Sequence, residues 1–223
     1  MIFALASAIS FRTESAVVFQ KKPTMSNLLI SRIRDYISLS EQEVCLVNSL
    51  FLKELHRKND LILKEGDVCD KFFFIERGII RLTKTLEGKE RTLVFRAEGC
   101  FGTIIESFST QAPSPISIYA IEPCILNTIS FKDLEMFYQK LKEGDRFGRL
   151  IIEEVIIESS SHLTAMHTLS PEQRFINLTK DHPELIERIP QYMIASFLGI
   201  EPQTLCRIKK RCLKLDVSSL KTN

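Results

Sequence analysis

The chain has 223 residues, of which 44% are hydrophobic and 26% are charged. This length exceeds one typical domain of about 100–150 residues and predicts two domains, while the composition argues against a disordered or fibrous protein. Thirty Lys and Arg residues face 28 Asp and Glu residues, a net charge of +2, so any affinity for nucleic acid must be local. No apolar run reaches the roughly 18 residues that a membrane-spanning helix needs, which argues against a transmembrane protein.

The cysteines and the amino end indicate the cellular compartment in which the protein is expected. The six cysteines include no CxxC pair and no Cys and His spacing of a zinc finger. They are expected to be free, mostly buried thiols in a reducing cytoplasm, and no metal or other cofactor is expected. The apolar start of the chain lacks the basic residues of a signal peptide. Residues 1–24 are expected to be a tail, and Met25 is an alternative native start.

Residues 26–58 are predicted to be helical, because apolar side chains recur there at roughly helical spacing. Within this stretch Ser40 precedes Glu43 by three residues, the pattern of a capping box. A new helix is therefore expected to begin at this point.

Between residues 61 and 130, short apolar runs alternate with glycine and acidic turns. The runs are residues 61–63, 72–75, 79–82, 91–95, 116–121 and 124–129. Leu86-Glu87-Gly88-Lys89 separates two of them and predicts a β-hairpin. Many short strands at nearly even spacing predict an antiparallel roll or sandwich. Ser130 and Asp133 then indicate the start of a helix.

A long helix is predicted from about residue 143 to residue 168. Its apolar positions cover more than one face, so it needs a second partner besides the roll, and a twin helix in a homodimer is favoured. Burial of the helix within its own chain is the alternative. Ser170, Pro171 and Gln173 then form a complete helix start. The predicted division is therefore residues 25–142, 143–169 and 170–223.

Residues 189–210 have the pattern of a helix-turn-helix. Pro190 suits the first helical position, and Pro202 can begin the second helix without losing a backbone hydrogen bond. Gly199 can adopt a positive φ and turn the chain sharply between the helices. Ala195 is small where the two helices must cross closely.

The two faces of the second helix differ in character. Its inward face is expected to carry Leu205, Ile208 and Cys212. Its outward face is expected to carry Gln203, Cys206, Arg207 and Lys210. Gln and Arg side chains can each form two hydrogen bonds with a base edge, so Gln203 and Arg207 are expected to read bases. Lys209, Lys210 and Arg211 suit phosphate contacts, which supply affinity without sequence information.

The order of a roll, a long helix and a helix-turn-helix over residues 28–212 resembles the Crp/Fnr family of bacterial transcription regulators. The residues that carry the resemblance are 62–67, 73–82, 88–90, 101–102 and 195–207. The resemblance implies an α+β fold: an N-terminal antiparallel β-roll of the cyclic-nucleotide-binding type (a double-stranded β-helix), a long dimerisation helix and a C-terminal helix-turn-helix domain. It also implies a homodimer without enzyme activity that binds a two-fold-symmetric operator in double-stranded DNA, with Thr204 on the phosphates.

The roll departs from the family members that bind cAMP. Those members carry a Glu for the ribose and an Arg for the cyclic phosphate, at positions held here by Ile104 and Ser114. No Lys or Arg lies between Arg96 and Lys132, and a buried phosphate without a cation is costly. Tight binding of cAMP or cGMP is therefore not expected, which leaves an unknown small-molecule effector open. The candidate effector pocket comprises Phe101, Gly102, Thr103, Ile104, Glu106 and Ser114.

Other functions compete with DNA-binding regulation. A metal-dependent enzyme of the roll type needs clustered His and carboxylate side chains, but residues 59–131 contain no His. A ligand-sensing or interaction protein with a vestigial DNA-binding domain is the main alternative, supported by the acidic Glu201 near the expected phosphates. A basic helix end that complements the helix dipole would explain the three cations, but not the small residue, glycine and proline before them.

Overall fold

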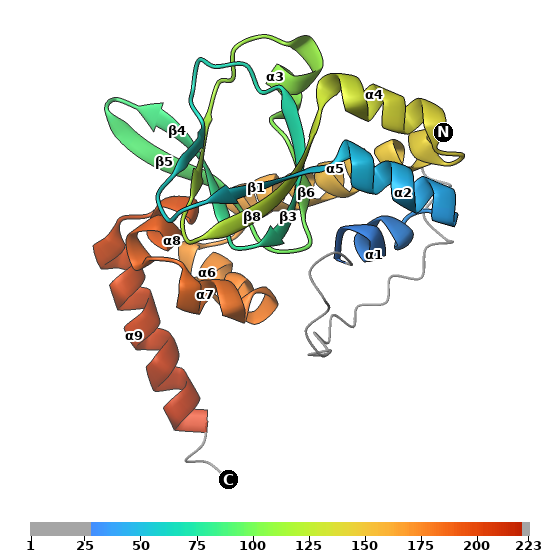
Figure 1. Ribbon diagram of the computed structural model, residues 1–223. Coiled ribbons are helices and arrows are strands. Elements are labelled where there is room, and N and C mark those ends of the chain that lie inside the picture. The colour runs from blue at the N-terminus through green and yellow to red at the C-terminus, as the bar shows by residue number, and fades with distance from the viewer. Residues whose placement is uncertain (1–27, 220–223) are drawn as a thin grey trace, which may run out of the picture.

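The computed structural model describes the backbone of residues 28–219 and the side chains as far as residue 212; the tail expected at residues 1–24 lies outside this range. Two four-stranded antiparallel sheets form a β-roll (Figure 1). The first sheet has the order β1 (Leu52–His56), β8 (Cys124–Ser130), β3 (Lys71–Arg77) and β6 (Phe101–Gly102). The second has the order β2 (Leu61–Leu63), β7 (Ser117–Ala120), β4 (Ile80–Leu86) and β5 (Lys89–Arg96).

Helices surround the roll at both ends. They are α1 (Leu28–Arg34), α2 (Glu41–Leu50), α3 (Ile105–Thr110), α4 (Phe131–Lys140), α5 (Gly144–Thr168), α6 (Pro171–Asp181), α7 (Pro183–Arg188), α8 (Gln191–Phe197) and α9 (Pro202–Ser219). Figure 1 shows α1, α2 and α4 on one side of the roll and α6 to α9 on the other, with α5 running between the two groups. In the part of the chain that the structure describes, no helix is both long and apolar enough to cross a membrane. The predicted α+β fold with a β-roll, a long helix and C-terminal helices is confirmed.

The predicted hairpin connects β4 to β5. Leu86 pairs with Lys89 across its turn. The two residues between them, Glu87 and Gly88, have φ values of 52° and 73°. Positive φ at both central positions is what a two-residue type I′ turn requires, so the turn chemistry seen in the sequence is confirmed.

The prediction of helix over residues 26–58 is only partly right. The capping box is present at the start of α2, where the Ser40 hydroxyl accepts a hydrogen bond from the Glu43 amide and the Ser40 amide donates to the Glu43 carboxylate at 2.9 Å. Leu52–His56 form β1 instead, an edge strand paired with β8. Its Leu, Lys and Glu residues favour a helix, but pairing with a strand some 70 residues away overrides this local preference.

The other predicted helix starts are confirmed. The Ser130 hydroxyl accepts a hydrogen bond from the Asp133 amide at the start of α4. Ser170 and Gln173 form a second capping box at the start of α6. The predicted long helix is α5, which begins one residue later than expected. The capping signals at α4 and α6 lie within one helical turn, whereas α5 was predicted from apolar spacing along its whole length.

Three hydrophobic clusters hold the described chain together. One lies between the two sheets, and a second joins the roll to α1, α2, α4 and α5. The third joins Ile79, Phe95 and Ile121 of the roll to side chains of α6 to α9. Each fully buried side chain of this kind contributes about 1.5–3 kcal/mol, so the C-terminal helices are part of the packed molecule.

Gly78, which follows β3, occupies a position that only glycine fits. Its φ is +97°, and an added Cβ would lie 2.6 Å from Cys124 Sγ and 2.7 Å from the Pro123 carbonyl oxygen. We expect Gly78→Ala to lower the free energy of unfolding by about 2 kcal/mol or more, through the strained backbone and the collision together. Gly88→Ala is the matched control, because its φ is also positive but nothing lies within 4 Å. Urea unfolding measures both variants, and an equal loss would contradict the steric argument.

Candidate nucleic-acid interface and effector cavity

The helices α8 and α9 form the predicted helix-turn-helix. α8 begins one residue after Pro190, and α9 begins at Pro202. Gly199 has a φ of 69°, and the Ile200 amide donates to the Ala195 carbonyl oxygen at 3.0 Å across the turn. Ala195 is fully buried, which allows α8 and α9 to approach closely. The small residue, the glycine and the second proline thus have the structural positions predicted for them, and the first proline lies one residue before its helix.

Arg174, which the sequence did not single out, ties this motif to the long helix. Its Nη2 donates to the Leu198 carbonyl at 2.8 Å, and its Nη1 donates to the carbonyls of Leu169 and Met166 at 3.0 and 3.1 Å. These oxygens lie at the C-terminal ends of α8 and α5, where no further helical amide can reach them. Arg174 therefore fixes the end of α8 to the end of α5.

The two faces of α9 differ as predicted. Leu205 and Ile208 are each 1% exposed, and Cys212 packs partly buried against the same cluster. The outward residues Gln203, Cys206, Arg207 and Lys210 are all exposed. Within residues 28–212, Arg207 and Lys210 make no ion pair. The outward face of α9 is therefore open to solvent and carries two positive charges, those of Arg207 and Lys210.

The other candidate residues on α9 contact neighbouring helices. Lys209 Nζ donates to Gln191 Oε1 at 2.8 Å, and Arg211 pairs with Glu172 at 3.3 Å. Thr204 is half-buried in the first turn of α9. Lys209 and Arg211 thus brace α9 against α8 and α6 in addition to contributing positive charge.

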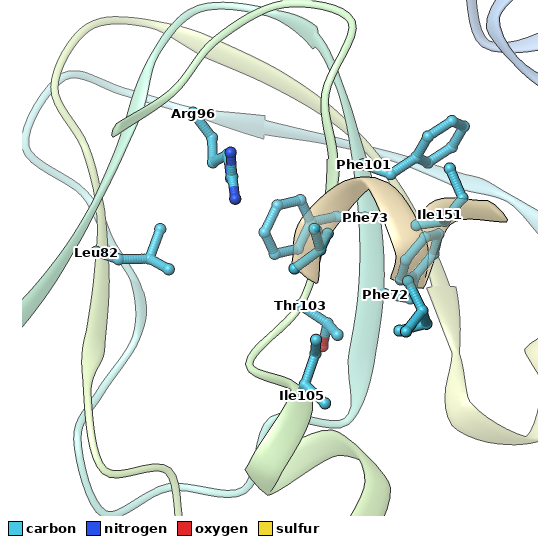
Figure 2. Close-up of a pocket in the computed structure, with 11 residues that line it drawn as sticks. Phe72, Phe73, Leu82, Arg96, Phe101, Thr103, Ile105 and Ile151 are labelled. Atoms are coloured by element: carbon cyan, nitrogen blue, oxygen red, sulfur yellow. The ribbon is translucent and has the colours of Figure 1, made fainter. Parts of the chain in front are cut away.

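A cavity of about 60 Å³ lies between the β-roll and α5 (Figure 2). Most of its wall is apolar, with Phe72, Phe73 and Leu82 from the roll and Ile151, Ile152 and Val155 from α5. Sites for small molecules typically measure about 300–1,000 Å³. This cavity is therefore too small for a typical effector unless the surrounding side chains move.

The predicted effector pocket coincides only in part with this cavity. Phe101, Gly102 and Thr103 line it. Ile104 is instead buried in the core between the sheets, and Glu106 is exposed on α3. Ser114 is buried, with its hydroxyl donating to the Ile116 carbonyl at 2.7 Å. These last three residues do not line the cavity.

Arg96 supplies positive charge to the cavity wall. Figure 2 shows its side chain extending into the space between Leu82 and Phe73. The side chain is 14% exposed and forms an ion pair with Glu158 of α5, so its charge is balanced within the chain. Arg96 is the last residue of β5 and precedes the stretch of residues 97–131 that contains no cation, so its place at the cavity was not expected from the sequence.

The outward side of α5 exposes a row of apolar side chains. Ile152, Ile156 and Leu163 are 42%, 60% and 59% exposed, and Met166 is half-buried at the end of the row. Together with Ser159 these residues follow one another at alternating intervals of four and three, as the a and d positions of a coiled coil do. Apolar spacing in the sequence predicts a second partner for this helix, and Ile152, Ile156 and Leu163 are exposed apolar residues on which that prediction depends.

The cysteines are all free thiols, as predicted. Cys69 and Cys124 are buried, Cys100 and Cys212 are partly buried, and Cys45 and Cys206 are exposed. The expectation that most are buried is therefore right only if partial burial is included. Across the residues that the structure describes, no three His, Cys, Asp or Glu side chains gather as a metal site would require.

Comparisons with known proteins address the fold. The family model of the cyclic nucleotide-binding domain matches residues 53–141, which extend from β1 to the end of α4. Among curated proteins, none matches the sequence. The chain is similar in structure to FixK2 from Bradyrhizobium japonicum, with a TM-score of 0.63 and 14% identity over 74% of this chain and 86% of that one.

Two further solved structures show the same similarity. The c-di-GMP-responsive global regulator CLP of Xanthomonas campestris has a TM-score of 0.64 and 14% identity over 79% of this chain and 93% of its own. The catabolite activator protein of Thermus thermophilus has a TM-score of 0.51 and 21% identity over 83% of this chain and 88% of its own. Residues 53–141 thus match the cyclic nucleotide-binding domain family, and the chain shares the fold of these solved regulators, the fold expected from the resemblance of its sequence to the Crp/Fnr family.

Proposed function

We propose that this protein is a DNA-binding transcription regulator that binds a two-fold-symmetric operator. The outward face of α9 carries the proposal, because Gln203 and Arg207 are exposed there one helical turn apart. Side chains at this spacing point in the same direction, so both can reach base edges in one major groove. Lys209, Lys210 and Arg211 follow on the same helix and suit the flanking phosphates, as does Thr204 at its start.

The exposed row on α5 supports a homodimer. Exposed large apolar side chains in one row are unfavourable in water, and two copies that pack these rows together bury them. The dimer places one α9 in each of two half-sites. In this arrangement residues 25–142 form the roll domain, residues 143–169 form the dimerisation helix and residues 170–223 bind DNA.

The test of this function is a mobility shift with a library of genomic DNA fragments. The protein is expected to select fragments that share a two-fold-symmetric motif. The affinity is expected to fall as the salt concentration rises, because contacts with phosphates release counterions. Absence of salt-sensitive binding at low ionic strength would rule out the function and favour the alternative, a sensing or interaction protein with a vestigial DNA-binding domain.

The same proposal includes a roll that does not bind cAMP or cGMP tightly. Ile104 and Ser114 offer neither the carboxylate nor the guanidinium that the ribose and the cyclic phosphate need. Arg96, the cation that the cavity does have, is already paired with Glu158. The cavity is also well below the size of a typical ligand site.

Isothermal titration with cAMP is expected to give a dissociation constant weaker than about 1 mM, equivalent to less than about 4 kcal/mol of binding. The reason is the cost of burying a phosphate beside an arginine that has its own carboxylate partner. Protein from cells unable to make cAMP is the control, since copurified nucleotide would mask binding. A dissociation constant in the low micromolar range would contradict this expectation.

A further inference from the structure

The helices α6 to α9 pack directly against the end of the β-roll. The rings of Phe95 on β5 and Phe197 on α8 lie 5.5 Å apart, and Phe197 also stacks on His162 of α5 at 4.9 Å. His162 of α5 therefore packs against α8. The Thr92 amide on the edge strand β5 donates to Ser196 Oγ of α8 at 2.9 Å. α8 thus covers the outer edge of β5.

Arg188, the last residue of α7, contacts two carboxylates of the β-roll. Its Nη1 and Nη2 donate to the two oxygens of Glu98 at 3.1 and 2.7 Å, a two-pronged contact. Its Nε and Nη2 also donate to Glu122, with Nε at 3.4 Å. The three side chains are only 32%, 33% and 25% exposed. A two-pronged, partly buried network of this kind contributes more than a single exposed ion pair.

Glu98 is itself fixed within the roll. Its carboxylate accepts a hydrogen bond from the Gly78 amide at 2.8 Å. Burial alone would raise the pKa of the Glu98 carboxyl, but the hydrogen bonds from Arg188 and Gly78 outweigh burial and lower this pKa. Glu98 is therefore charged at neutral pH and presents a fixed anion to Arg188.

The same part of the roll also forms the cavity wall. Glu98 lies in residues 96–101, which connect β5 to β6. At one end of this segment Arg96 lines the cavity and pairs with Glu158 of α5. At the other end Phe101 lines the cavity as well. One short segment therefore contacts the cavity, the long helix and α7.

We propose that Arg188, Glu98 and Glu122 form a latch that holds α6 to α9 against the roll and so sets the direction in which α9 points. Glu98 belongs to residues 96–101, which line the cavity at both ends. A displacement of this segment therefore also moves the carboxylate that holds Arg188, and with it the helices α6 to α9. The latch follows from the contacts alone. Its effect on DNA binding rests on the proposed function.

Hydrogen exchange at the Thr92 amide tests the latch in the full-length protein without DNA. Arg188→Gln removes the charge and the two-pronged donor. We expect the Thr92 amide to exchange about tenfold faster or more in this variant, because Ser196 moves away when α8 leaves β5. Arg34→Gln is the control, since it removes an exposed pair with Glu41 between α1 and α2 and is expected to leave this exchange unchanged. Unchanged exchange at Thr92 in Arg188→Gln would overturn the proposal.

Glu98→Gln provides a second test if Arg188→Gln fails to fold, as judged by far-ultraviolet circular dichroism. It keeps the shape of the side chain and removes its charge, so exchange at Thr92 is again expected to rise. In the double variant the two effects are expected to be less than additive, because both substitutions break the same contact. Fully additive effects, or no effect of Glu98→Gln, would show that Arg188 and Glu98 do not hold α8 on β5 through one shared contact.

DNA binding is measured separately in the same variants. A severalfold loss of affinity in Arg188→Gln, with Arg34→Gln unchanged, supports the role of the latch in directing α9. Wild-type affinity in Arg188→Gln, despite faster exchange at Thr92, would overturn that role. If the wild-type protein binds no DNA while the exchange result holds, the latch stands and the proposed function fails.

Discussion

The Ile156→Asp variant is expected to be monomeric at concentrations where the wild-type protein is a dimer. Ile156 is 60% exposed in the middle of the apolar row on α5. In a two-fold dimer this row packs against its own copy, so the substitution places two carboxylates in one apolar interface. The desolvation of each charge costs several kcal/mol, and we expect the dissociation constant of the dimer to rise more than about 100-fold. Sedimentation velocity measures this change.

Ser161→Asp is the matched control for the dimer. Ser161 is exposed on the same helix, but it points away from the row, so the same added charge is expected to leave the dimer intact. Circular dichroism should show equal helix content in both variants. A dimer of Ile156→Asp as tight as the wild type would show that the row on α5 is not the interface.

Arg207→Ala is expected to weaken binding to the selected operator by about 1–3 kcal/mol for each half-site and to relax the preference at one base pair of each half-site. Arg207 is exposed on the outward face of α9 and makes no ion pair within residues 28–212. Lys210→Ala is expected to act differently: affinity falls for all sequences alike, and the slope of log affinity against log salt concentration decreases by about two, because the dimer loses one phosphate contact in each half-site. Fluorescence anisotropy with operator variants at several salt concentrations separates the two effects.

Arg57→Ala is the control for the operator experiments. Arg57 is an exposed arginine in the turn between β1 and β2, so its removal changes the net charge by the same amount without touching α9. Its affinity for the operator is expected to match the wild type. Equal binding by Arg207→Ala and the wild type would remove the base-reading role and favour a vestigial DNA-binding domain.

Features that depend on neighbours in the sequence were predicted correctly. The capping Ser40, the hairpin turn at Gly88 and the interhelical turn at Gly199 each act within about four residues. Their effect follows from hydrogen bonds and φ values that the local chain decides. For the same reason the two faces of α9 could be assigned from helical spacing alone.

Features that depend on distant partners could not be predicted. β1 exists because β8 lies beside it, and nothing within residues 52–56 indicates that strand. Arg96 pairs with Glu158 and Arg188 pairs with Glu98, and these partners are 62 and 90 residues away in the sequence. Ion pairs between such segments leave no spacing pattern in a single sequence.

The same difference between local and distant contacts explains why one candidate site was predicted better than the other. The exposed residues of α9 form one surface because a helix fixes their relative positions. The effector pocket was inferred by counting along a loop, and the loop residues separate into the cavity wall, the core between the sheets and the surface. A position in a loop does not determine where its side chain points, so of the six predicted residues only Phe101, Gly102 and Thr103 line the cavity, together with Ile105, which was not predicted.

The helix-turn-helix also protects the roll to which it is attached. β5 ends the row of strands in its sheet, and α8 covers it through Ser196 and Phe197. An uncovered edge strand offers its backbone to strands of other molecules and promotes aggregation. A roll expressed without the C-terminal helices would carry such an edge, so the two parts of this chain are not interchangeable modules.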